Sequence, residues 1–347
     1  MQNNLLQKVP PSSLAFVMAT GIVGMAANLL HQLNMSKLMF WITNISFFIL
    51  LLMVVLRLLF YFKRFVSDLA SHDKGAGVLT LVAGSSILGI NYAQGQNNYK
   101  MAEIFLFFSL ITWVILIYAF LLSVILKKEK PPLRTGMNGS WLLLTVATQS
   151  IAVLSTTISS VYFHDAMIFI ALTSFLLGIA LYLLIITMDF YRLLFHPVES
   201  EDVKPSYWIN LGAAAITSVA GFVLAKTVGG DALFGDYYSF IKSAAVMFWA
   251  IASFWLPLLL LMELWRYVIK KSSLQYSPDW WSMVFPLGMY TVATFRLSEQ
   301  ITFSFLTTIA NIFLFIALLA WLGTFIGMCV HFLTQNQNKE QPLPVNN

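Results

Sequence analysis

The residues that could do chemistry in this chain are mainly hydroxyl and amide side chains, which recur at helical spacing inside apolar runs. Between residues 139 and 161, Thr145, Thr148, Gln149 and Thr156 fall on one face of a predicted helix. Neutral side chains of this kind can hydrogen-bond a small solute, but they form no acid–base or nucleophile pair for catalysis. The pattern therefore indicates a face that contacts either a solute or a neighbouring helix.

Similar stripes occur in two other apolar runs. Small and hydroxyl side chains also let helices pack closely, with each hydroxyl bonded to its own backbone, and this explains any single stripe. Several stripes together favour a shared central pathway. The members of these stripes are Ser13, Thr20, Gly24 and Ala27 in the first run, and Asn210, Ala213, Ala214, Thr217, Ala220 and Gly221 in the second.

Catalytic and cofactor sites have little support in the sequence. One cysteine, Cys329, excludes an internal disulfide, and the five histidines form no i, i+4 pair, so we expect no metal, no haem and no enzyme activity. The cluster from Ser71 to Lys74 is interpreted as a solvated loop. The acids Asp189, Glu263 and Glu103 lie towards the ends of apolar runs, as interfacial anchors or partners of nearby arginines.

An interrupted helix stands out at Trp280–Leu297, "WWSMVFPLGMYTVATFRL", where Phe285 precedes Pro286 and Gly288 follows. Proline removes a backbone donor and disturbs the turn before it. We expect Pro286 to fix the direction of the Phe285 ring, and Gly288, on the same face, to leave room for it. The alternative is an ordinary proline kink beside a core phenylalanine.

The elements that must position these residues are membrane-spanning helices. The chain has 347 residues, of which 59% are hydrophobic and 10% charged, more apolar surface than a soluble domain can bury. We predict an all-α polytopic membrane protein with ten spans. They lie near residues 12–32, 37–60, 75–93, 101–126, 139–161, 165–192, 206–228, 237–268, 278–297 and 302–333, between a cytoplasmic segment 1–11 and a disordered cytoplasmic tail 334–347.

Charge orients the predicted spans. With both termini in the cytoplasm, 15 of the 20 Lys and Arg residues fall in inner segments and five in outer ones. Arg296 is one of the five, and it either attracts anions at an outer mouth or anchors the helix at the interface. The net charge of +5 therefore reflects topology and does not indicate nucleic-acid binding.

The spans alternate in composition. The odd-numbered spans contain 10 glycines and 4 phenylalanines, whereas the even-numbered spans contain 3 glycines and 20 phenylalanines. Small residues suit helices that pack near an axis, and large rings suit helices that face lipid. We infer five helical hairpins, with the odd helices inside and the even helices outside.

Three segments resemble a known family. "FVMATGIVGMA" (Phe16–Ala26), "SWLLLTVATQSIAVL" (Ser140–Leu154) and "WWSMVFPLGMYTVATFRL" are similar to the matching segments of the tellurite-resistance/dicarboxylate transporter family. This family includes the yeast malic-acid transporter, sulfite efflux pumps, bacterial tellurite-resistance proteins and the plant slow-type anion channels.

The resemblance implies a fold and a site. It implies five hairpins around a quasi-five-fold central pore, a homotrimer with one pore in each protomer, and a phenylalanine plug at the position of Phe285. The plug is formed with Pro286 and Gly288. The predicted pore-lining residues are Thr20, Gly24, Gly84, Thr145, Gln149, Thr156, Asn210, Thr217 and Arg296.

The expected activity is transport of a small anion, because a pore lined by hydroxyls, glycines and backbone N–H groups suits anions and no acidic ring or filter for cations is evident. C4-dicarboxylates such as malate are the first candidates for the transported anion. The alternatives are a chloride or nitrate channel and an exporter of sulfite or tellurite-type oxyanions. The expected partners are the lipid bilayer and two further copies of the chain, with no cofactor and no nucleic acid, in a bacterial inner membrane.

Overall fold

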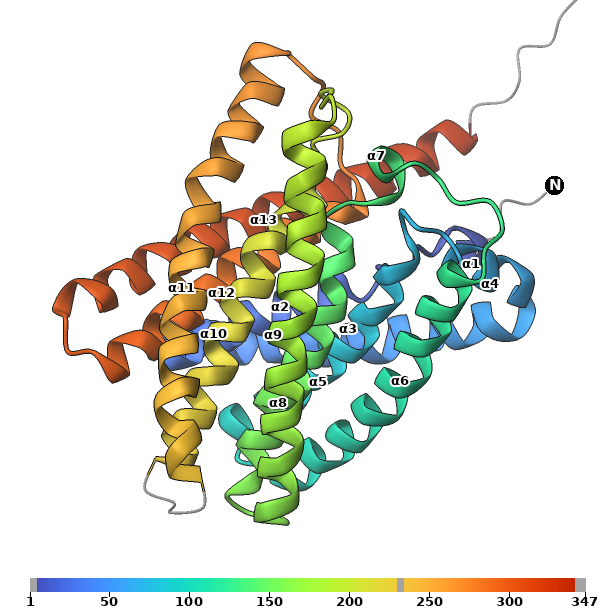
Figure 1. Cartoon of the computed structure of the whole chain (residues 1–347). Coiled ribbons are helices and arrows are strands. Elements are labelled where there is room, and N and C mark those ends of the chain that lie inside the picture. Colours follow the sequence, from blue (N-terminus) through green and yellow to red (C-terminus); the bar gives the residue numbers. More distant parts are fainter. Residues whose placement is uncertain (1–4, 230–233, 341–347) are drawn as a thin grey trace, which may run out of the picture.

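Ten helices of 15 residues or more dominate the computed structural model, which describes residues 5–229 and 234–340 (Figure 1). Within these ranges no strand is formed. The long helices are α2 (Ala15–Leu29), α3 (Leu33–Phe60), α5 (Thr80–Gln96), α6 (Tyr99–Ile125), α8 (Leu143–Ser159), α9 (His164–Phe195), α10 (Ile209–Val228), α11 (Gly235–Leu264), α12 (Trp281–Gln300) and α13 (Ser304–Glu340).

Eight helices of the described residues are long and apolar enough to cross a membrane. The other two long helices are α2, which has 15 residues, and α12, which includes Arg296 and Glu299 near its end. The sequence predicted a disordered tail at residues 334–347. Residues 334–340 of this tail are helical instead, since they form the last part of α13. Residues 1–4 and 341–347 of the predicted terminal segments lie outside the described residues.

Burial divides the long helices into two groups. The most apolar stretches of α5, α8 and α10 are each 94% buried, whereas those of α3, α6, α9, α11 and α13 are only 22–33% buried. Most of α2 and α12 is buried as well. We call α2, α5, α8, α10 and α12 the inner helices, and α3, α6, α9, α11 and α13 the outer helices. The alternation of small and bulky residues in the sequence thus follows a difference in burial.

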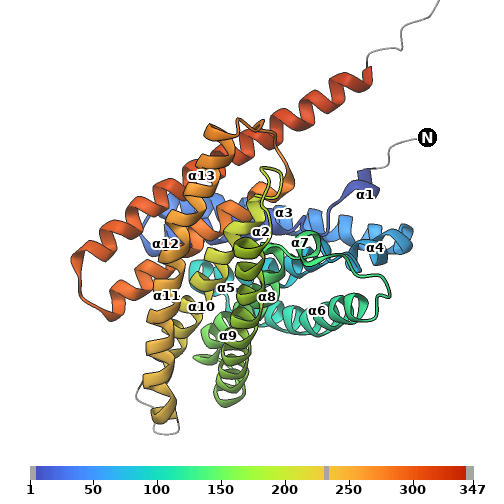
Figure 2. The same ribbon diagram turned by 45° about the horizontal axis from the view of Figure 1, so that its top comes forward.

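The inner helices contact one another in a closed cycle. Helix α2 packs on α5, α5 on α8, α8 on α10, α10 on α12, and α12 returns to α2. Each inner helix also packs along the outer helix that follows it in the chain. Figures 1 and 2 show the outer helices on the periphery, with the connections α2–α3, α5–α6, α8–α9 and α12–α13 gathered at the lower left of Figure 1.

Four inner helices begin with a short 3-10 turn at the opposite end of the cycle. These turns are η1 (Gly75–Leu79), η2 (Gly139–Leu142), η3 (Pro205–Trp208) and η6 (Pro278–Trp280), which lead into α5, α8, α10 and α12. Proline opens η3 and η6, because its fixed φ suits the first position of a helix and its missing N–H is not needed there. A further turn at Pro10–Ser13 precedes α2.

Polar side chains join each outer helix to the inner helix of the next pair. Indole N–H groups of Trp113, Trp249 and Trp321 donate to hydroxyl oxygens of Thr148, Thr294 and Thr20 at 2.9, 3.0 and 2.9 Å. At the two other junctions, Asn44 of α3 donates to Tyr92 of α5, and Asn210 of α10 donates to Asp189 of α9. In lipid such bonds contribute about 0.6 kcal/mol each on average, so they define pairing more than they add stability.

Glycine at position 139 is required where η2 approaches η3. A Cβ atom there would lie 2.2 Å from the Ser206 carbonyl oxygen and 2.8 Å from the Tyr207 Cα. Because both atoms belong to the backbone, neither can move aside as a flexible side chain could. The starts of α8 and α10 are therefore held in close contact.

We predict that Gly139→Ala lowers the free energy of unfolding by at least about 1–3 kcal/mol, the usual cost of overpacking. The thermal unfolding midpoint of the purified protein in detergent measures this effect. Gly95→Ala is the control, since a Cβ at Gly95 meets nothing within 4 Å. Equal midpoints for the two variants would contradict the prediction.

Candidate functional site

Phe285 is fully buried on α12 and lies against the backbone of α10. A Cβ atom on Gly212 would be 3.1 Å from Phe285 Cε1 and 2.8 Å from Pro286 Cγ. Gly288 faces α2 instead, where a Cβ would lie 2.9 Å from Ile22 Cγ2. The space for the Phe285 ring therefore comes from Gly212, and the expectation that Gly288 provides it was wrong. Gly288 lets α12 approach α2.

An inner vestibule lies at the starts of all five inner helices. It is a cavity of about 420 Å³, and its wall includes one small residue from each inner helix or from the turn that leads into that helix. These residues are Ser12, Gly77, Ser140, Ser206 and Ser282. Ser282 lines this cavity, and Phe285 follows it by about one turn of α12 without being one of the lining residues.

These small residues were missed by the sequence reasoning, although a signal for them exists. Each lies near the start of an odd-numbered span. Four of them precede the first residue of the following α-helix by three positions, namely Ser12, Gly77, Ser140 and Ser206, whereas Ser282 is the second residue of α12. Three residues after Ser140, Ser206 and Ser282 come Leu143, Ile209 and Phe285, and the first two also line the inner vestibule. The signal is therefore a small residue within the first five positions of each odd-numbered span.

The inner vestibule contains both signs of charge. Its cations are Arg57, Arg64, Lys74 and Lys204, and its acids are Asp68, Asp73 and Asp279. Arg57 is ion-paired with Asp68, and Lys204 Nζ lies 2.9 Å from Asp73 Oδ1. Helix N-terminal ends add partial positive charge to the same space.

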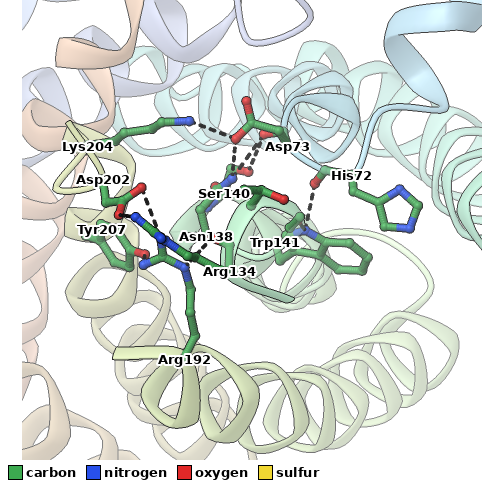
Figure 3. Close-up of polar contacts among 12 residues, drawn as sticks. His72, Asp73, Arg134, Asn138, Ser140, Trp141, Arg192, Asp202, Lys204 and Tyr207 are labelled. Carbon is green, nitrogen blue, oxygen red and sulfur yellow. Dashed lines mark hydrogen bonds and ion pairs between the residues drawn. The ribbon is translucent and has the colours of Figure 1, made fainter. Parts of the chain in front are cut away.

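Asp73 connects three of the segments that lead into inner helices (Figure 3). Its carboxylate accepts a hydrogen bond from Asn138 Nδ2 at 2.8 Å and pairs with Lys204, while the indole of Trp141 donates to the His72 carbonyl at 2.8 Å. The interpretation of the Ser71–Lys74 cluster as merely solvated was therefore wrong. Burial, together with the nearby Lys127 and Lys130, lowers the pKa of His72, so this histidine adds no charge at neutral pH.

A second group of contacts surrounds Arg192, at the end of α9 (Figure 3). Arg192 donates to the hydroxyl of Tyr207, and its guanidinium lies 3.5 Å from Asp202, which Arg134 also approaches at 3.5 Å. Arg192 and Tyr207 are buried, so these bonds fix η3 against α9. Arg192 therefore pairs with Asp202 and not with Asp189, the acid suggested by the sequence, which accepts a hydrogen bond from Asn210 instead.

An outer vestibule of about 230 Å³ lies at the other end of the cycle. Gln94, Thr156, Lys226, Arg296 and Glu299 are among its lining residues. Arg296 follows Phe285 by 11 residues, which places both on one face of α12 about 16 Å apart along the helix. Phe285 therefore lies between the two vestibules, on the face of α12 that ends at Arg296.

The other predicted lining residues of α2 and α5 contact neighbouring helices. Thr20 accepts a hydrogen bond from Trp321 of α13. A Cβ on Gly24 would lie 2.9 Å from Met39 of α3, and one on Gly84 would lie 3.5 Å from Val17 of α2. These contacts correspond to the helix-packing alternative for the stripe of α2.

The stripes of α8 and α10 also face outer helices. Gln149 donates to the Phe175 carbonyl of α9 at 3.1 Å, and Asn210 donates to Asp189 of α9 at 2.8 Å. Thr145 and Thr217 share the faces of Gln149 and Asn210, and the Thr217 hydroxyl donates to its own helix at Ala213. Of the nine predicted lining residues, Thr156 and Arg296 are the two that line a vestibule among the described cavities.

A closed cycle of buried helices, with a vestibule at each end and apolar helices around it, defines a membrane protein of the transporter and channel class. Residues 8–329 match the voltage-dependent anion channel (SLAC1) family, so the chain belongs to this family. The family resemblance inferred from the three sequence segments is thereby confirmed.

Relatives of this chain occur in bacteria and archaea. An uncharacterized membrane protein of Mycobacterium tuberculosis is 34% identical over 152 residues, which are 44% of this chain and 76% of that protein. Two uncharacterized transporters of Methanocaldococcus jannaschii are similar over most of their length. The first is 23% identical, and the match covers 90% of this chain and 91% of that transporter. The second is 25% identical, and the match covers 87% of this chain and 87% of that transporter.

We predict that Lys204→Gln lowers anion flux entering from the inner vestibule, because it leaves the carboxylate of Asp73 without its counter-ion. The expected loss is about two- to fivefold at low ionic strength and smaller at high salt, since exposed charges are screened. Anion flux into proteoliposomes measures it.

Two variants control this experiment. Lys128→Gln removes an exposed lysine that is outside the vestibule and should change little. The double variant Lys204→Gln/Asp73→Asn restores the charge balance and should recover part of the flux. An equal loss in Lys128→Gln would show that the effect comes from total charge and not from the vestibule.

Proposed function

We propose that the axis enclosed by the five inner helices is a pathway for anions across the membrane, with Phe285 as its plug. The observation that carries this proposal is the position of a fully buried phenylalanine between two charged vestibules on one face of α12. The cyclic contacts of α2, α5, α8, α10 and α12 support this proposal, because the axis that they enclose is the direct line from one vestibule to the other.

The proposed topology has ten spans arranged as five hairpins in a bacterial inner membrane, with both termini on the cytoplasmic side. The excess of Lys and Arg at the end that contains the inner vestibule supports this orientation. Helix α2, with only 15 residues, is surrounded by protein on most sides and need not match the bilayer thickness by itself. By family resemblance we further propose a homotrimer with one pathway in each protomer.

Anion selectivity is proposed to arise at the two ends of the pathway. Lys74 and Lys204 at the inner vestibule, and Lys226 and Arg296 at the outer one, attract anions. The N-terminal ends of the inner helices point their positive dipoles at the inner vestibule. Between Ser282 and Arg296, α12 carries no charged side chain, so the path itself would bind a passing anion only weakly.

The proposed substrates are C4-dicarboxylates such as malate. Vestibules of about 420 and 230 Å³ are large enough for an anion of this size. Chloride or nitrate, and sulfite or tellurite-type oxyanions, are the alternatives, because a path without fixed charge discriminates mainly by size. The width at Phe285 would then set the selection.

We predict that Phe285→Ala raises anion flux severalfold, because it removes the ring that closes the path. Truncating a buried phenylalanine costs about 3–5 kcal/mol of stability, so folding has to be verified by size-exclusion chromatography. Phe248→Ala is the matched control. Phe248 is also fully buried, but it lies on outer helix α11 and packs edge-on against Tyr182, 5.2 Å between ring centroids.

The comparison between the two variants decides the outcome. Flux that rises in Phe285→Ala and not in Phe248→Ala supports the plug. Folded Phe285→Ala protein with unchanged flux would argue against it, and an equal rise in both variants would indicate leakage from loosened packing.

A further inference from the structure

We propose that Lys226 and Arg296 form an outer binding site for carboxylate anions, and that Glu299 occupies this site as a tethered competitor. This inference rests on the proposed function, since it assigns a ligand class and a regulator to the outer vestibule. Its structural basis is the way in which one carboxylate joins cations from two inner helices.

The Glu299 carboxylate bridges α10 and α12. Its Oε2 atom lies 2.7 Å from Arg296 Nη1, and its Oε1 atom lies 3.0 Å from Lys226 Nζ. Each oxygen thus has its own cation, an arrangement that a carboxylate of a free anion could reproduce. Arg296 is only 12% exposed, so its charge is partly shielded from water and from salt.

The site has polar atoms that Glu299 does not use. Among the described residues, the buried Nε donor of Arg296 and the buried Oε1 acceptor of Gln94 have no hydrogen-bond partner. Gln94 lies on α5, across the outer vestibule, and rotation of its amide would present an N–H group to a guest. A free anion could therefore engage α5, α10 and α12 together, which Glu299, attached to α12, does not.

The hydroxyls in the outer vestibule contribute less to anion binding. Thr156 and Thr157 of α8 donate their hydroxyl protons to the carbonyls of Ala152 and Val153 in their own helix, so they present lone pairs to the cavity. Recognition therefore depends on Lys226 and Arg296, with Gln94 as the neutral donor. A carboxylate fits this set because it matches the two cations in the way Glu299 already does.

Glu299 would keep the affinity of the site low. A side chain tethered next to its own cations competes at an effective concentration of roughly millimolar or higher. Weak binding suits a site on a transport path, since the anion must leave as readily as it enters. Removing the negative charge of Glu299 should therefore tighten anion binding at the outer vestibule.

The test compares malate and nitrate binding to the purified full-length protein in detergent by isothermal titration calorimetry. Glu299→Gln preserves the shape of the side chain and should lower the Kd for malate about tenfold, the order expected when a competitor at millimolar effective concentration is removed. Glu299→Asp, which is one methylene shorter and cannot bridge both cations well, should give a smaller gain. It also serves if Glu299→Gln does not fold.

Glu199→Gln is the matched control, because Glu199 is also paired with an arginine, Arg134 at 2.7 Å, but lies at the other end of the molecule. Unchanged malate affinity in both Glu299 variants, or an equal gain in Glu199→Gln, would overturn the inference. A gain for nitrate as large as that for malate would overturn the assignment to carboxylates.

The same proteins separate this inference from the proposed function. Anion flux in wild-type and Phe285→Ala proteoliposomes tests the pathway without reference to Glu299. If anion flux is observed but the Glu299 variants bind malate as the wild type does, the inference of an outer site is overturned and the proposed pathway is retained. A Glu299 effect without flux in either protein supports the site and argues against the pathway.

Discussion

Helices α12 and α10 approach each other so closely that the Phe285 ring of α12 packs directly against the α10 backbone at Gly212. A methyl group on Gly212 would come within 3.1 Å of the ring and 2.8 Å of Pro286, so this position tolerates no side chain without movement of α12. On its other flank α12 is held against Ile22 of α2 through Gly288. Helix α12 is thus held between α10 and α2 by two close approaches at glycine, which contribute to the closed cycle of inner helices.

Polar groups in this fold serve two separate purposes. Within the helical region they pair an outer helix with the next inner helix, as Trp113, Trp249 and Trp321 do with threonines. At the ends of the cycle they form charged vestibules, with Asp73 and Lys204 at one end and Glu299 with Arg296 at the other. The two kinds of polar group lie in different places because their surroundings differ. Within lipid a polar group has to be paired, whereas at the ends of the helices water solvates charge.

The sequence predicted the broad plan well because composition reports burial directly. Bulky rings mark the outer helices and small residues the inner ones, and three segments, one of which includes Phe285, identified the family. The direction of the polar stripes could not be predicted, because a stripe shows that one face is polar without showing which neighbour it meets. Gln149 and Asn210 meet outer helices. The Asp73 contacts required loops distant in the sequence to converge, and no local pattern indicates that.

The central claim is that the axis behind Phe285 conducts anions. The most direct measurement is the reversal potential of the current through Phe285→Ala protein in a planar bilayer under a potassium chloride gradient. The account predicts a sustained current whose reversal potential follows the chloride gradient. A reversal potential that follows potassium, or no current from folded and inserted protein, would contradict it.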